Sequence, residues 1–157
     1  MDLLGFIKQD HEEMRNLLQR LTGEADPARE SIRGLQETLA DLLVNHSKME
    51  EQFLYPRMCE VQDAKDLIND SYKEHEEAIG VLKIIAKLHP LTEEWSRQCE
   101  KLRKAVERHM GEEEDRLFAM IRRNLDDQEM NRICQQMLQL REERMVITPD
   151  IPVEPTG

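Results

Sequence analysis

The sequence has few cysteines, few aromatic residues and no long apolar segment. Its three cysteines, Cys59, Cys99 and Cys134, are widely spaced, which fits neither a disulfide framework nor a cysteine-rich zinc site. No apolar run approaches the roughly 20 residues that a membrane-spanning helix needs. The N-terminus lacks a basic segment followed by an apolar one, so we expect no signal peptide. These absences predict a cytoplasmic protein whose cysteines are reduced.

Positive charge is also scarce relative to negative charge. The chain has 22 Lys and Arg residues against 33 Asp and Glu residues, and its formal net charge at pH 7 is −11. Binding to nucleic acid depends on basic side chains that neutralise phosphates. Anionic membranes likewise attract basic segments. We therefore expect neither nucleic acid nor a membrane among its partners.

Glycine and proline are sparse as well, with six of each, and the composition favours helix. Helical periodicity and capping signals, with Thr92 and Asp126 as predicted N-caps, indicate five helices. Their expected ranges are 2–22, 27–60, 65–88, 92–123 and 126–144. The predicted fold class is all-α, an up-down-up-down four-helix bundle. We expect the bundle at 1–125, an additional C-terminal helix at 126–144 and a flexible Pro-rich tail at 145–157.

Each of the first four helices has an apolar stripe in which residues recur at alternating intervals of three and four. Such a stripe is the core-facing seam of a bundle. We expect Phe53 near the end of the second helix and Met120 near the end of the fourth to face inward. One position in each stripe is a histidine: His11, His46, His75 and His109. A single histidine in such a stripe is commonly a core residue, but four of them, one per helix, indicate metal ligands.

The chain also contains an internal repeat. His11-Glu-Glu-Met resembles His75-Glu-Glu-Ala, at an offset of 75 − 11 = 64 residues. A His-x-x-x-Glu motif at 46–50 recurs at 109–113, at an offset of 109 − 46 = 63 residues. The sequence therefore predicts two related helical hairpins, each with one lone histidine and one His-x-x-x-Glu motif.

The His-x-x-x-Glu spacing suits metal binding. Residues four apart share one helix face, about 6 Å apart along the axis, and a buried carboxylate is costly unless it pairs or binds metal. Imidazole suits iron, copper, nickel and zinc, and a bridging carboxylate suits two cations held close together. We predict a two-metal site with two histidines per ion, shared Glu50 and Glu113, and open positions for oxide, hydroxide, water or a small ligand. Glu51 and Glu114 are alternative carboxylates.

Two tyrosines lie close to these motifs in the sequence. Tyr55 follows Glu51 by four residues, and Tyr72 precedes His75 by three. Either phenol could be redox-active or a further metal ligand. We favour a core aromatic for Tyr55, since Phe118 occupies its repeat position.

The last predicted helix has its own apolar face. Met130, Ile133, Met137 and Leu140 share that face. It either packs back onto the bundle or forms a homodimer.

The pattern H…HxxxE…H…HxxxE resembles the hemerythrin-like (HHE cation-binding) domains, from Ile7 to about Arg123. Supporting segments are Gln-Asp-His11, Glu-Glu-Gln-Phe-Leu-Tyr-Pro56, Glu-His75-Glu and Glu-Glu-Asp-Arg-Leu-Phe118. The resemblance implies two non-haem iron ions, bridged by oxide or hydroxide and by Glu50 and Glu113. Ferritin-like bundles instead use Glu-x-x-His motifs. None occurs here, because Lys8, Leu43, Tyr72 and Val106 stand three residues before the four histidines.

The chain departs from the oxygen-carrying members of that family at two positions. Those members have a second histidine where Ile79 stands and an aspartate where Glu114 stands. The resemblance therefore favours the branches that react with peroxide or nitric oxide, and we favour a peroxide-consuming, peroxidase- or catalase-like protein. The alternative is a non-catalytic protein that binds, stores or senses oxygen or iron. A third interpretation is a structural bundle whose buried histidines bind no metal.

Overall fold

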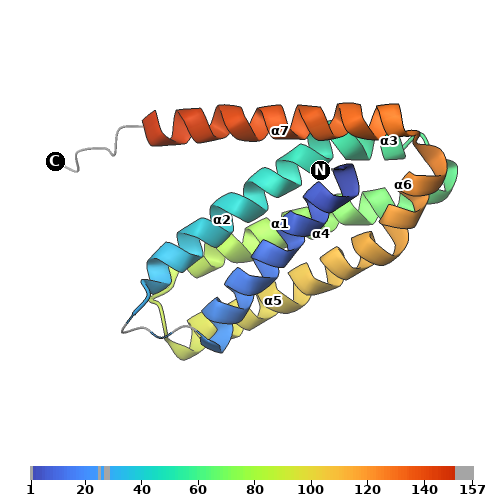
Figure 1. Cartoon of the computed structure of the whole chain (residues 1–157). Coiled ribbons are helices and arrows are strands. Elements are labelled where there is room, and N and C mark those ends of the chain that lie inside the picture. The colour runs from blue at the N-terminus through green and yellow to red at the C-terminus, as the bar shows by residue number, and fades with distance from the viewer. Residues whose placement is uncertain (1, 25, 27–28, 151–157) are drawn as a thin grey trace.

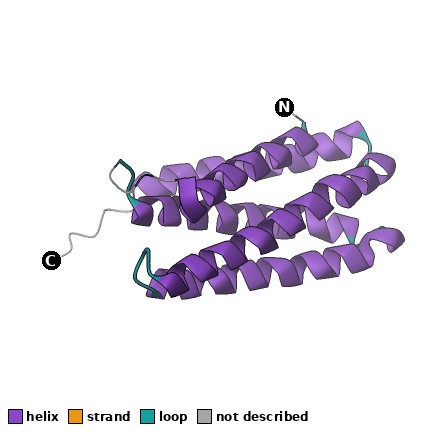
Figure 2. Ribbon diagram, turned by 90° about the horizontal axis from the view of Figure 1, so that it is seen from below, coloured by secondary structure: helices purple, strands orange, loops and turns teal. Residues whose placement is uncertain are grey.

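The computed structural model describes residues 2–24, 26 and 29–150. The described residues form helices and short connections and contain no β-strand (Figure 2). The α-helices are α1 Leu3–Gln19, α2 Ile32–Met49, α3 Tyr55–Met58, α4 Lys65–Lys87, α5 Glu93–Glu112, α6 Phe118–Asn124 and α7 Asp127–Asp150. Wider π-helical turns occupy Glu50–Leu54 and Glu113–Leu117, and a 3₁₀ turn occupies Gln62–Ala64. The segment Arg20–Glu24 follows α1 and contains a break at Gly23, whose φ is 152°. The π-helical turns join α2 to α3 and α5 to α6, so each pair is one long helical segment.

Side-chain caps define several helix starts. Asp2, Ser31 and Thr92 each accept a hydrogen bond from the backbone N–H three residues later, which satisfies a donor that the first turn leaves free. Asp126 does the same for Glu129. The predicted caps at Thr92 and Asp126 are therefore confirmed. The second helix begins at Ile32, later than expected, because Ser31 is its N-cap.

The helices form an antiparallel four-helix bundle (Figure 1). Around it, α1 packs beside α2 and α5, and α4 packs beside the same two helices. The π-helical turns and the short helices that follow them continue α2 and α5 at one end. The predicted all-α, up-down-up-down bundle with an extra C-terminal helix is confirmed.

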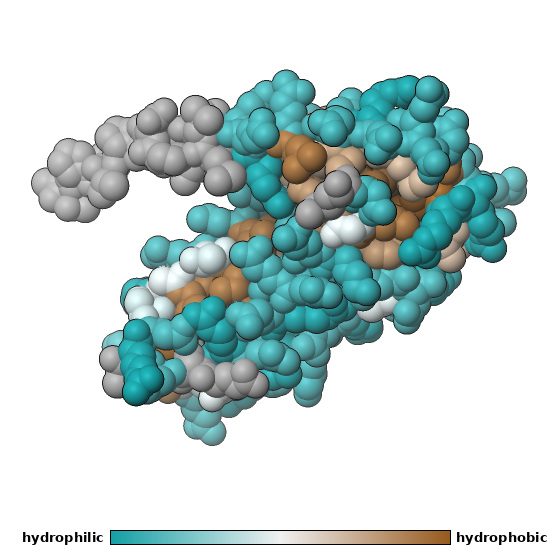
Figure 3. Space-filling model, viewed as in Figure 1, coloured by the Kyte–Doolittle hydropathy of each residue, from teal (hydrophilic) through white to brown (hydrophobic). Residues whose placement is uncertain are grey.

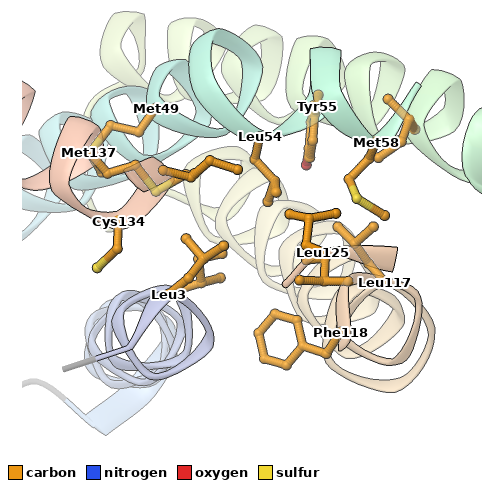
Figure 4. Packing of buried hydrophobic residues seen from close by; sticks show 14 of the residues in the cluster. Leu3, Met49, Leu54, Tyr55, Met58, Leu117, Phe118, Leu125, Cys134 and Met137 are labelled. Atoms are coloured by element: carbon orange, nitrogen blue, oxygen red, sulfur yellow. The ribbon is translucent and has the colours of Figure 1, made fainter. Parts of the chain in front are cut away.

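The hydrophobic core consists of two clusters on either side of a polar level. One cluster contains Ile7, Met49 and Leu117 and extends to α7 (Figure 4). The other contains Met14 and Leu43, nearer the opposite end of the bundle. Because His11 and His46 fall between these apolar residues in their helices, the core places the histidines in the interior between two dry layers.

The last helix, α7, packs against the bundle. Ile133, Cys134 and Met137 are buried in the first cluster, and Met130 and Leu140 pack at its edge. The apolar face of α7 is therefore used within the chain, which supports the packing alternative; the homodimer stays an untested prediction. The helix runs to Asp150, so 145–150, assigned above to the tail, are helical, and the rest of that tail lies outside the described residues.

The exterior is mainly hydrophilic, with apolar strips between helices (Figure 3). Ile84 and Leu91 are the large hydrophobic residues found exposed in the described part of the chain. No described helix combines the length and apolar character needed to cross a bilayer. No disulfide joins the three cysteines, and Cys99 and Cys134 are buried.

Candidate metal centre

All six residues predicted as ligands meet in the bundle interior. Each helix of the bundle contributes one histidine, and two of the helices are followed directly by a glutamate that begins a π-helical turn. Every one of the six side chains is buried, with at most 7% of its surface exposed. They are His11, His46, Glu50, His75, His109 and Glu113.

Each glutamate faces two histidines from different helices. Oε2 of Glu50 lies 3.3 Å from Nε2 of His46, and Oε1 lies 3.1 Å from Nε2 of His75. Oε1 of Glu113 lies 3.1 Å from Nε2 of His11, and Oε2 lies 3.6 Å from Nε2 of His109. Each carboxylate thus spans from one pair of histidines to the other, the arrangement that a carboxylate bridging two cations requires.

The donor atoms form two groups, each compact enough for one ion. In both groups the ligand atoms lie within 4.8 Å of one another. Glu50 belongs to both, so the two positions are adjacent. The first group is His11, His46, Glu50 and Glu113, and the second is Glu50, His75 and His109.

Two of these buried atoms have no hydrogen-bond partner. They are Nε2 of His46 and Oε2 of Glu50. Buried polar atoms are nearly always paired, because leaving one without a partner costs free energy. A cation between these atoms would satisfy both, so the residues present fit a bound metal.

The outer nitrogen of every one of the four histidines meets a carboxylate. Nδ1 of His11 lies 2.7 Å from Glu114, and Nδ1 of His75 lies 2.6 Å from Glu51. Nδ1 of His46 lies 2.8 Å from Asp10, and Nδ1 of His109 lies 2.7 Å from Glu74. A carboxylate there favours the proton on Nδ1 and directs the lone pair of Nε2 inward, as in metal-bound histidines.

These outer carboxylates follow the internal repeat. Glu51 and Glu114 directly follow the two inner glutamates, and Asp10 and Glu74 directly precede the two lone histidines. Glu51 and Glu114, considered above as alternative ligands, instead contact outer nitrogens. Asp10 and Glu74 were missed, although an acidic residue before the lone histidine of each repeat was a usable signal.

A π-helical turn follows each inner glutamate. The backbone N–H of Tyr55 bonds to the carbonyl of Glu50, and that of Phe118 bonds to the carbonyl of Glu113, both five residues back. Such turns insert one extra residue and often lie at functional sites. Here the insertion rotates the following residues relative to the glutamates and brings the Tyr55 ring towards the site.

Tyr55 is a core aromatic residue, as the sequence favoured, and its hydroxyl also contacts the candidate site. Its side chain is fully buried, and its hydroxyl donates towards Glu113 at 2.6 Å and Glu50 at 3.0 Å. The hydroxyl also lies 3.2 Å from Nε2 of His75. Tyr72 stays outside this group: it is half-buried and packs edge-on against the Tyr55 ring, 5.2 Å away.

In the metal-free chain, the buried imidazoles and carboxylates shift one another's pKa values. Burial lowers the pKa of His46, but Glu50 and Asp10 outweigh it and raise that pKa to about 10. Burial also lowers the pKa of His75, but the carboxylates of Glu50 and Glu51 outweigh it and raise that pKa to about 9. Burial raises the pKa of Glu50, but His46 and His75 outweigh it and hold that pKa well below its usual value. Proton and metal therefore compete for the imidazoles.

A small cavity adjoins three of the histidines. Its volume is about 20 Å³, room for roughly one water-sized molecule. Its walls include His46, His75 and His109 together with mostly apolar side chains. These are Met14, Leu43, Ala78, Ala105, Val106 and Met110. The cavity suits a small ligand with few hydrogen-bonding atoms.

Comparison with known proteins supports this assignment. The family profile of the hemerythrin HHE cation-binding domain matches residues 2–121. A curated protein named DNA nickase, from Nostoc sp. (strain PCC 7120 / SAG 25.82 / UTEX 2576), is 29% identical over 132 residues. That match covers 82% of this chain and 36% of the nickase, so the chain spans about a third of that relative's length. No solved structure matches the chain significantly.

Proposed function

Because the chain belongs to the hemerythrin HHE cation-binding domain family, we propose that it holds a pair of non-haem iron ions that react with peroxide, oxygen or nitric oxide. The observation that carries the proposal is the pair of buried glutamates. Each directs its two oxygens at Nε2 atoms of two different histidines, at 3.1–3.6 Å. Imidazole and carboxylate together suit iron.

The donor groups define how the ions would be held. His11 and His46 would bind one ion, and His75 and His109 the other. Glu50 and Glu113 would be shared between them, and oxide or hydroxide would complete the bridge. This count leaves each ion short of a full shell, which is typical of reactive rather than structural sites.

The surrounding residues suit a redox reaction with a small molecule. An iron pair, when bound, would take electrons from one peroxide and pass them to another, giving oxygen and water, or would bind oxygen or nitric oxide. The outer carboxylates Asp10, Glu51, Glu74 and Glu114 hold each imidazole in one orientation. The apolar walls formed by Met14, Leu43 and Val106 exclude bulk water and larger substrates. We favour peroxide turnover among the three reactions.

We do not propose for this chain the DNA-nicking activity that the name of the Nostoc relative states. The match covers only 36% of that protein, and the net charge of −11 opposes binding to a polyanion.

Peroxide consumption before and after metal removal tests the proposal. We expect the iron-loaded chain to consume peroxide, the chelated chain to lose that activity, and added iron to restore it. The variant His46→Ala, loaded in parallel, should remain inactive. Peroxide loss that persists at full rate in the metal-free chain would overturn the proposal.

A non-catalytic role is the second candidate, because the cavity has room for about one small molecule. In that case the iron-loaded chain would bind oxygen, or store or sense oxygen or iron, without turnover. A reversible change of the visible spectrum under oxygen, with no peroxide consumed, would favour this candidate over the first.

A further inference from the structure

The hydroxyl of Tyr55 lies inside the candidate metal centre. The ring descends from α3 into the core beside Leu54 and Met58 (Figure 4), and none of its surface is exposed. Its oxygen lies 2.6 Å from Oε2 of Glu113 and 3.0 Å from Oε1 of Glu50. The buried phenol is shielded from bulk solvent, and its oxygen is directed at the site.

The neighbours of this oxygen belong to one side of the centre. Oε1 of Glu50 and Oε2 of Glu113 are the oxygens that face His75 and His109. The Tyr55 oxygen is also 3.2 Å from Nε2 of His75. The hydroxyl therefore lies with the second group of donors and not with His11 and His46.

The second group also contains fewer donor residues than the first. The first group brings four residues within 4.8 Å of one another, whereas the second brings three. Because Glu113 Oε2 is 3.6 Å from His109 but 2.6 Å from Tyr55, the phenol oxygen stands between that carboxylate and the other donors. As a ligand it would be a donor additional to the shared carboxylates.

The Tyr55 hydroxyl has no counterpart in the other hairpin, so it breaks the twofold relation between the two hairpins. Phe118 occupies the repeat position of Tyr55, at 118 − 55 = 63 residues. Phe118 stacks on His11 at 6.4 Å as Tyr55 stacks on His75 at 5.4 Å. Only the tyrosine has a hydroxyl, and the Glu50 oxygen on the opposite side, Oε2, has no hydrogen-bond partner. The two metal positions thus differ by one oxygen donor.

We propose that Tyr55 is a direct ligand of the ion held by His75 and His109, an assignment that rests on the proposed function. On ligation the phenol O–H is replaced by an oxygen–metal bond, and the proton leaves to solvent. An anionic phenolate donor stabilises the ferric state relative to the ferrous state. The ion at His75 and His109 would then be harder to reduce than its neighbour.

Visible and resonance Raman spectra of the oxidised, iron-loaded chain test the assignment. A ferric phenolate absorbs in the visible region, and excitation there enhances tyrosine ring vibrations. The chain has two tyrosines, so in Tyr72→Phe any tyrosine signal must come from Tyr55. We expect the enhanced ring vibrations to persist in Tyr72→Phe and to be lost in Tyr55→Phe, with about two irons per chain in both.

Iron content, measured on the same samples, separates the possible failures. A wild-type chain that binds no iron would overturn the proposed function and this assignment together. A full iron load without tyrosine vibrations in Tyr72→Phe would overturn the ligand role alone and leave Tyr55 as a hydrogen-bond donor to Glu113. Because that readout needs only Tyr72→Phe, it holds even where Tyr55→Phe does not fold.

Discussion

Arg141 of α7 donates to Asp10 of α1 from both terminal guanidinium nitrogens, at 2.9 and 2.6 Å. Asp10 in turn lies 2.8 Å from Nδ1 of His46. The family profile matches residues 2–121, so α7 lies outside the matched region and yet contacts the carboxylate that orients a proposed ligand. The extra helix is therefore part of the support of the site as well as a cover for the core.

Replacing Arg141 should destabilise the protein. In Arg141→Leu the buried carboxylate of Asp10 loses two charge-assisted hydrogen bonds, and the ring of Phe6 loses the guanidinium 4.7 Å from its centroid. We expect the free energy of unfolding to fall by about 1–3 kcal/mol, measured by urea denaturation of the metal-free chain. Arg132→Leu, at an exposed position of the same helix, is the control. Equal stability of the two variants would contradict a structural role for the contact.

Removing a proposed ligand should lower the metal content. His46→Ala deletes one of the donors of the first group, and Glu113→Ala deletes a carboxylate that we propose is shared by both ions. Each variant should therefore retain much less iron than the wild type. Elemental analysis after loading measures this directly. His89→Ala is the matched control, because His89 is exposed at the end of α4. Unchanged loading in both ligand variants would refute the site.

Much of this architecture could be predicted from the sequence because its signals are local. The three-and-four spacing of apolar residues and the caps at Thr92 and Asp126 identify helices without reference to the rest of the fold. The internal repeat then relates the two hairpins, and the histidines follow from their place in the apolar stripes. The structure brings together all six residues chosen in this way.

The predicted burial pattern fails beyond the two inner glutamates. Phe53 and Met120 were expected to face inward, but both are half-buried, whereas Leu54 and Ile121 are fully buried. The reason is that a π-helical turn begins at each glutamate and inserts one residue, which shifts the inward face by one position. A periodicity of 3.6 cannot anticipate this shift.

The contacts outside the histidines were only partly predictable. Asp10 and Glu74 each precede the lone histidine of a repeat, and the repeat could have singled them out. Arg141 could not be found in this way, because its contact with Asp10 depends on how α7 lies across α1. The core position of Tyr55 was expected and is confirmed, but burial alone does not reveal the direction of its hydroxyl.

Removing the charge of an outer carboxylate should reduce metal affinity without removing a ligand. In Glu74→Gln the bond to Nδ1 of His109 loses its charge, so the imidazole becomes a weaker and less fixed donor. Changes of this kind typically lower metal affinity by about 10- to 100-fold. Competition with a chelator of known affinity measures the loss. The control Glu77→Gln, on the exposed side of α4, should bind metal as the wild type does. Equal affinities in the two variants would contradict a contribution of the outer carboxylates to metal binding.

The metal-free chain should lose stability as pH rises above neutrality. His46 titrates at 6.5 when unperturbed, and its pKa in the folded chain is about 10 because the carboxylates of Glu50 and Asp10 outweigh burial. A raised pKa means that the folded state holds the proton more tightly, so this stabilisation is complete below about pH 6.5 and disappears as pH rises through 10. Urea denaturation between pH 6 and pH 10, roughly the interval between the two pKa values, measures the slope. In His46→Ala the decline should be shallower. An identical decline in both chains would show that His46 is not the group responsible.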